Sequence, residues 1–126
     1  MYSRRLDEDR DSVFELFSRG IGLLSDGRPH QAAIPLARAK LLEPEKASIR
    51  EALGRALFMS GRVGWARREF AKAVQIDPAS DYAHFGLALA CERTGERDRA
   101  IGHLKLAIAM RPGIEHYERA LARLAG

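Results

Sequence analysis

The sequence lacks several features that define other classes of protein. It has one cysteine, Cys91, so an intramolecular disulfide and a cysteine-based metal cluster are both excluded. Its uncharged stretches are short and broken by Gly, Ser or Pro, far from the roughly 18 apolar residues of a membrane-spanning helix. The segment after Arg4 and Arg5 is charged rather than apolar, which argues against a secretory signal. We therefore expect a soluble, cytoplasmic protein that is stabilised by packing alone.

The composition is that of one folded domain. The chain has 126 residues, of which 46% are hydrophobic and 30% are charged, so it contains enough apolar material to build a core. The formal net charge is +4, and the basic excess is spread along the chain rather than gathered into one run. A nucleic acid partner is compatible with this charge but is not indicated by it.

Identical residues recur at a fixed interval of 34 positions. A looser apolar column formed by Leu36, Phe70 and Leu104 keeps the same register. Because several identical columns in one register are hard to obtain by chance, they indicate an internal repeat. The identical columns are Gly27, Gly61 and Gly95; Ala32, Ala66 and Ala100; Ala39, Ala73 and Ala107; and Pro44, Pro78 and Pro112.

Each column has a physical reason. The glycines follow apolar helical stretches and lie in polar turns, where a left-handed residue that ends a helix costs least as glycine. The alanines let two helix backbones approach closely, and Leu36, four residues after Ala32, lies on the same helix face. The prolines follow the second apolar stretch of each repeat and stop it. Each repeat is therefore predicted to be a pair of helices.

The period and its pattern resemble the tetratricopeptide repeat (TPR). The residues that carry the resemblance in the second repeat are Leu53, Gly54, Ala66, Phe70, Ala73 and Pro78. The resemblance implies an all-α fold, a right-handed α-solenoid of three TPR hairpins at about 13–46, 47–80 and 81–114, with a C-terminal capping helix over 115–126. A charged N-terminal extension, residues 1–11, would precede the repeats. Ser12 and Glu15 have the spacing of a capping box before the first helix.

The resemblance also implies a concave groove lined by the first helix of each repeat. This candidate groove is apolar at one end and basic at the other. An alternative interpretation is that several of its side chains pack between neighbouring first helices or under the N-terminal extension. The candidate partner-binding residues are Phe14, Phe17, Ile21, Glu51, Arg55, Phe58, Met59, Tyr82, Phe85, Leu89, Arg93, Arg119 and Arg123.

One departure from the family pattern narrows the expected ligand. Several family members hold a C-terminal carboxylate with a clamp of Lys, Asn and Arg. Without that clamp, we expect an apolar or amphipathic protein segment in the groove, with the arginines meeting acids beside it. The clamp positions here hold Phe17, Ile21, Ala52, Tyr82 and Gly86.

Other candidate sites are weaker. Trp65 stands where this family usually carries a charged residue, and it marks either an outer-face interface or, as we favour, a half-buried contact with neighbouring helices. The four histidines have no metal-ligand spacing, and no phosphate loop or catalytic motif is present. We therefore predict no metal, no cofactor and no enzyme active site.

The sequence thus predicts a non-enzymatic protein–protein interaction module, an adaptor or scaffold whose partner is another protein or peptide segment. Two alternatives stay open. One is a basic RNA- or ribosome-associated protein, whose binding would weaken steeply with salt. The other is a structural homo-oligomer that pairs through its last helix or its outer face.

Overall fold

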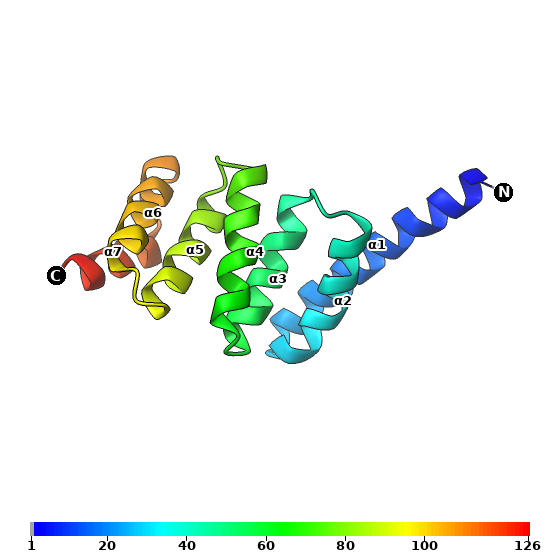
Figure 1. Ribbon diagram of the computed structural model, residues 1–126, viewed down its shortest axis with the longest axis horizontal. Helices are drawn as coiled ribbons and strands as arrows, with labels where there is room; N and C mark the ends of the chain where they lie inside the picture. The colour runs from blue at the N-terminus through cyan, green and yellow to red at the C-terminus, as the bar shows by residue number, and fades with distance from the viewer. Residues whose placement is uncertain (1) are drawn as a thin grey trace.

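The chain forms a row of antiparallel helices. The computed structural model describes residues 2–126, and their side chains from residue 12 onward. No strand is formed within this range, and the helices stack side by side along one axis (Figure 1). The predicted all-α fold is confirmed. The helices are α1 Tyr2–Ser25, α2 Pro29–Leu42, α3 Ala47–Met59, α4 Val63–Ile76, α5 Asp81–Arg93, α6 Arg97–Met110 and α7 Glu115–Ala125.

Six of these helices pair into hairpins, α1 with α2, α3 with α4 and α5 with α6, and α7 packs against α6. The turn of each hairpin contains a glycine in the left-handed region, with φ of 73° at Gly27 and 83° at both Gly61 and Gly95. The predicted role of this glycine column is confirmed. The second helices end two residues before the prolines that were predicted to stop them, Pro44, Pro78 and Pro112.

The repeated small and large residues form the core. The alanine column that begins at Ala32 is fully buried, and Leu36, Phe70 and Leu104 are 0%, 3% and 0% exposed. The ring of Phe70 occupies the space that a side chain at Gly86 would need, since a Cβ there would lie 2.3 Å from its Cε1. Large side chains on the second helices therefore fit against small residues on the first helices, as ridges fit into grooves.

The two helices of a hairpin do not have equivalent places in the stack. Among the described residues, α1 contacts α3 and α3 contacts α5, whereas α2 and α4, and α4 and α6, approach one another far less. The first helices therefore lie on the narrower, inner side of the stack, and the second helices spread apart on the outer side. This difference creates two distinct surfaces.

The first helix starts earlier than the sequence predicts. α1 already begins at Tyr2, so Ser12 lies inside a helix and the predicted capping box with Glu15 is wrong. A side-chain cap is instead formed at Ser80, whose Oγ accepts a hydrogen bond from the backbone N–H of Ala83 at 3.2 Å. None of the described helices, the 24-residue α1 included, is both long and apolar enough to cross a membrane.

The last helix, α7, has two contrasting faces. Tyr117 and Leu124 are 3% and 8% exposed, whereas Glu118 and Arg119 point outward. Buried and exposed side chains thus lie on opposite faces of this helix. α7 therefore covers the apolar surface that α5 and α6 would otherwise leave open.

Candidate protein-binding surfaces

Four of the candidate groove residues are exposed apolar side chains. Phe14 is 73% exposed and Met59 is 48% exposed, and Ile21 and Tyr82 are each 37% exposed. They come from α1, α3 and α5, the first helices of three successive hairpins. We call these four residues the inner apolar row, because they lie on the first helices, which form the inner side of the stack. They are apolar side chains that a partner could cover.

Other apolar candidates pack within the stack. Phe17 touches the buried residues of the core. The ring of Phe85 lies against α7, with centroid distances of 5.1 Å to His116 and 4.7 Å to Tyr117. These residues therefore follow the alternative interpretation, in which candidate side chains pack between helices. The half-buried candidates are Phe17, Phe58, Phe85 and Leu89.

Two of the candidate arginines already meet acids of this chain. Arg123 Nη2 lies 2.7 Å from Oε1 of Glu92 on α5. Arg119 lies 3.7 Å from Glu115, one turn earlier on α7. Both arginines are largely exposed, so these ion pairs contribute little to stability. A partner's acid would have to compete with Glu92 and Glu115 for them.

The remaining basic candidates lie beside aromatic rings. The guanidinium carbon of Arg93 is 5.1 Å from the ring centroid of Phe58, a cation–π contact between α5 and α3. Burial raises the pKa of Tyr82, and the positive charge of Arg55 nearby opposes that rise. The candidate residues on the first helices thus combine exposed apolar side chains with arginines.

Glu51 links two neighbouring hairpins on this side. The hydroxyl of Ser80 donates a hydrogen bond of 2.5 Å to its Oε1. Burial raises the pKa of Glu51, the bond from Ser80 lowers it, and Asp77 and Asp81 nearby raise it further. Because its carboxylate is held by Ser80, Glu51 positions α3 against the start of α5.

A cavity of about 570 Å³ lies on the outer side, between α2 and α4 and above α3. None of the candidate groove residues lines it. Trp65 forms part of its wall and is 62% exposed, so the predicted half-burial of this residue is wrong. The guanidinium of Arg68 lies 5.0 Å from the Trp65 ring centroid. We call this space the outer cavity.

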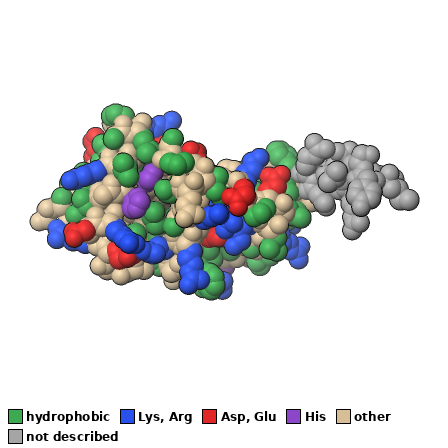
Figure 2. Space-filling model, turned by 45° about the horizontal axis from the view of Figure 1, so that its top comes forward, with side chains coloured by type: hydrophobic (Ala, Val, Ile, Leu, Met, Phe, Trp, Pro, Cys, Tyr) green, Lys and Arg blue, Asp and Glu red, His purple; other side chains and the backbone are tan. Residues whose placement is uncertain are grey.

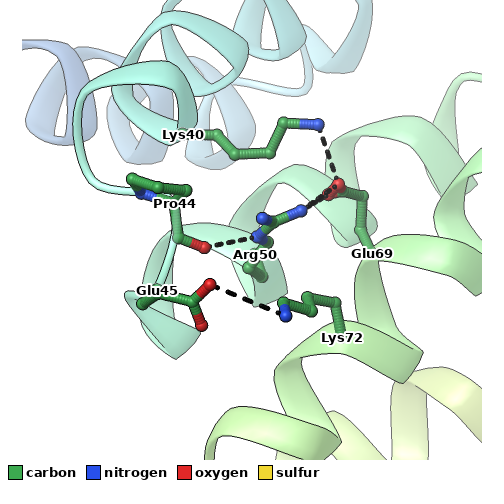
Figure 3. A network of polar contacts seen from close by, with 6 residues as sticks. All are labelled: Lys40, Pro44, Glu45, Arg50, Glu69 and Lys72. Carbon is green, nitrogen blue, oxygen red and sulfur yellow. Dashed lines mark hydrogen bonds and ion pairs between the residues drawn. The ribbon is translucent and has the colours of Figure 1, made fainter.

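A polar network holds the first two hairpins together beside the outer cavity (Figure 3). Glu69 is 6% exposed, and its Oε1 accepts hydrogen bonds of 3.0 Å from both Lys40 Nζ and Arg50 Nη1. Arg50 Nε also donates to the carbonyl oxygen of Pro44 at 3.0 Å. The buried carboxylate is therefore neutralised by two cations from different hairpins.

The third hairpin contains a histidine pair. Nδ1 of His84 lies 3.0 Å from Nδ1 of His103, and Nε2 of His84 lies 2.9 Å from the carbonyl oxygen of Pro78. Spacing along one helix does not reveal this pair, because its members lie on different helices. The repeat itself could have indicated the pair. Arg50 and Glu69, whose opposite charges favour a contact, stand 34 positions before His84 and His103.

The hydrogen bonds fix the protons of this pair. A carbonyl oxygen only accepts, so His84 Nε2 donates to Pro78 and a single hydrogen lies between the two Nδ1 atoms. Burial lowers the pKa of His103, and electrostatic interactions with His84, Arg99 and Arg67 lower it further. Among the side chains described from residue 12 on, no group of three or more His, Cys, Asp or Glu could hold a metal ion.

Comparison with known proteins finds a sequence relative and solved structures of the same fold. No protein-family model matches the chain. Superkiller complex protein 3 of Mus musculus is 32% identical to it over 106 residues. That match covers 84% of this chain but 7% of the mouse protein, so the chain spans only a small part of its relative's length.

Solved structures share the architecture. The TPR domain of Arabidopsis OM64 superposes with a TM-score of 0.88 at 17% identity, covering 92% of this chain and 96% of that one. The first TPR of Spaghetti (RPAP3), bound to the HSP90 peptide SRMEEVD, gives 0.87 at 13% identity over 91% of each chain. Identities this low establish likeness of fold alone. With its 34-residue period and stacked hairpins, the chain is a tetratricopeptide-repeat array in fold.

Proposed function

We propose that the chain is a non-enzymatic protein-interaction module that binds an apolar or amphipathic segment of another protein along its inner side. The inner apolar row carries this proposal, because large apolar side chains exposed on three successive first helices favour a partner that covers them. The RPAP3 domain, which has the same fold, was solved with a bound peptide, and this supports the proposal. The module would comprise repeats at about 13–46, 47–80 and 81–114, closed by 115–126.

The chemistry of the inner side favours an apolar segment over a chain terminus. A C-terminal carboxylate needs cations or amide donors in the groove. Phe17, Ile21 and Tyr82 occupy positions where a carboxylate clamp would need such groups. A carboxylate placed there would lose water without gaining hydrogen bonds.

The charge distribution favours a protein partner over nucleic acid. Arg119 and Arg123 are engaged by acids of this chain. On the face seen in Figure 2, basic and acidic side chains alternate with hydrophobic ones and do not form one basic patch. Binding to phosphates along a nucleic acid backbone needs clustered free cations.

The proposal is tested by removing the inner apolar row. The unchanged chain should capture a partner protein from lysate. We expect the double variant Phe14→Ser with Met59→Ser to capture at least tenfold less of that protein, measured by quantitative mass spectrometry. The matched control is Leu41→Ser with Leu106→Ser, which removes two apolar side chains of the second helices that are 78% and 46% exposed. The control should capture the same protein as the unchanged chain.

The choice of residues keeps folding and binding separate. Phe17 and Phe85 also belong to the candidate groove, but they pack against the core, so truncating them would destabilise the stack. Phe14 and Met59 are exposed, and their replacement should leave the helical circular dichroism and the urea midpoint nearly unchanged. Equal capture by the inner variant and the unchanged chain would assign binding to another surface.

A further inference from the structure

The outer side of the stack has two successive gaps between second helices, and their equivalent positions hold different residues. In the gap between α4 and α6, Arg67 on one side faces Glu96 on the other. In the gap between α2 and α4, the residues 34 positions earlier are Ala33 and Arg62. The two gaps are therefore equivalent in the repeat but differ in the side chains that line them.

The gap between α4 and α6 is bridged by an ion pair. Arg67 Nε lies 2.7 Å from Oε2 of Glu96, and its Nη2 lies 2.9 Å from Oε1. This two-point contact lowers the pKa of the Glu96 carboxyl, chiefly through the hydrogen bond from Arg67. The long arginine side chain therefore spans this gap.

The gap between α2 and α4 stays open because Ala33 cannot span it. The outer cavity of about 570 Å³ lies there, and the buried side chains of Leu53 and Leu57 on α3 form its floor. Ile34, 63% exposed, and Trp65, 62% exposed, form opposite walls. This lining of aliphatic and aromatic side chains suits an apolar group.

The rim of the outer cavity is cationic. His30, Arg38 and Arg62 line it with exposed side chains. Within residues 12–126, neither Arg38 nor Arg62 forms an ion pair. Glu69, the one acid in the lining, is bound by two cations. A ligand therefore meets uncompensated positive charge around an apolar floor.

We infer that the outer cavity is a second binding site, which takes bulky apolar side chains from an acidic segment of another protein. The apolar side chains enter above Leu53 and Leu57, and flanking carboxylates meet Arg38 and Arg62. Charge complementarity selects this partner, because a basic segment would face like charge at the rim. This site shares no residue with the inner apolar row, so both surfaces are available at once.

The sole tryptophan reports binding at this site. Trp65 is the only Trp in the chain and lies in the cavity wall, so a bound apolar side chain should shift its emission to shorter wavelength. The probe is a panel of short capped peptides with a central pair of Leu, Phe or Met between blocks of Glu. Calorimetric titration of the unchanged chain should detect micromolar binding by at least one of them. Matched peptides with Lys in place of Glu, or Ser in place of the apolar pair, should not bind.

The decisive variant transplants the bridge of the other gap. Ala33→Arg with Arg62→Glu introduces the pair that Arg67 and Glu96 form between α4 and α6, and it should weaken peptide affinity at least tenfold. Phe14→Ser with Met59→Ser, on the inner side, should bind the peptide as the unchanged chain does. A urea midpoint close to that of the unchanged chain shows that the transplant variant folds.

A second variant keeps the test open if the transplant fails to fold. Arg62→Glu alone reverses one rim charge, so it should weaken binding of the Glu peptides and improve binding of the Lys peptides. The inference is overturned if no Glu peptide binds, if the transplant binds as well as the unchanged chain, or if only the inner variant loses binding. It is also overturned if the chain binds a single-stranded RNA or dodecanoate but none of the peptides. A third contrary result is a dimer, detected by sedimentation, that must dissociate before a peptide can bind.

Discussion

The second and third hairpins place different chemistry at the same two positions. In the second, Arg50 and Glu69 form an ion pair of 3.0 Å, and Lys40 from the preceding hairpin joins it. In the third, His84 and His103 stand 34 positions later and approach to 3.0 Å. One site is a charged cluster across two hairpins, whereas the other is a pair within one hairpin that holds a single shared hydrogen.

What the two hairpins share is a bond to the loop before the first helix. Arg50 Nε donates to the carbonyl of Pro44 at 3.0 Å, and His84 Nε2 approaches the carbonyl of Pro78 at 2.9 Å. Two different donors thus bind the carbonyl at the same place in the repeat. The charge of the donor and of its second partner can vary between hairpins, so each hairpin has its own response to mutation and to pH.

The largest effect should come from breaking the charged cluster. We expect Glu69→Ala to lower the free energy of unfolding by about 3 kcal/mol, because it leaves two cations beside the core with no acid. The side chains of Glu69, Arg50 and Lys40 are 7%, 15% and 31% exposed, so water compensates only part of the loss. Urea unfolding at neutral pH measures the change.

An exposed ion pair nearby supplies the control. Glu45 lies 3.6 Å from Lys72, and their side chains are 71% and 36% exposed. Glu45→Ala should cost less than about 0.5 kcal/mol, because water screens this pair. If Glu69→Ala and Glu45→Ala had equal effects, the cluster could not be what distinguishes the second hairpin.

The next largest effect concerns Phe70, the side chain through which these hairpins touch. A Cβ at Gly86 would lie 2.3 Å from the Phe70 ring, which is 3% exposed and has no room to move. Gly86→Ala should therefore destabilise the chain by about 2 kcal/mol through overpacking. Thermal or urea unfolding checks this value.

A second helical glycine in the same hairpin gives the opposite expectation. Gly102 lies inside α6, and a Cβ there would meet nothing within 4 Å apart from its chain neighbours and the nearby backbone of its own helix. Gly102→Ala should stabilise the chain by about 1 kcal/mol, because alanine loses less backbone entropy in a helix. Equal signs for Gly86→Ala and Gly102→Ala would contradict the close approach of Phe70 to α5.

The sequence predicted the parts of this fold that packing determines directly. Gly61 in a turn and Ala66 and Phe70 in the core can each be identified from one column, because the backbone or the neighbouring helix allows few other residues there. The period then places equivalent residues in each hairpin. The glycine column likewise indicates where the first helices end, but no column indicates that the charged residues before Ser12 continue α1.

The contacts that differ between hairpins were harder to predict. The pairing of His84 with His103 depends on how two helices face each other, and only the opposite charges of Arg50 and Glu69 could have indicated it. The exposure of Trp65 depends on how far α2 and α4 spread apart, which spacing along the chain does not encode. The binding role of the candidate groove residues stays a prediction.

A smaller effect should appear as a pH dependence specific to the third hairpin. The folded chain lowers the pKa of His103 below its ordinary value of about 6.5, so the unfolded chain binds more protons under mildly acidic conditions. Stability from this group is therefore complete above about pH 7 and is lost as pH falls toward 5. We expect the melting temperature to fall by a few degrees over that range.

Copying the second hairpin's residues should remove this dependence. The variant His84→Arg with His103→Glu places an ion pair where the histidines meet, so no group there titrates between about pH 5 and 7. His30 and His116 remain in this variant, and both are exposed. A fall in melting temperature as large as that of the unchanged chain would assign the dependence to those histidines instead.

The smallest effect concerns how the two hairpins begin. Ser80 caps α5 through a hydrogen bond from the N–H of Ala83, whereas Lys46, the equivalent residue before α3, forms no side-chain cap. The backbone is already suited to a cap, because φ and ψ are −98° and 110° at Lys46 and −80° and 107° at Ser80. Lys46→Ser should therefore raise the free energy of unfolding by about 0.5–1 kcal/mol, measured by urea unfolding. Ser80→Ala should lower it by about 1 kcal/mol. If Lys46→Ser left the free energy of unfolding unchanged, the bond between Ser80 and Glu51 would be what holds the cap in place. A serine before α3 could not form that bond, because Phe17 stands where Glu51 stands one repeat later.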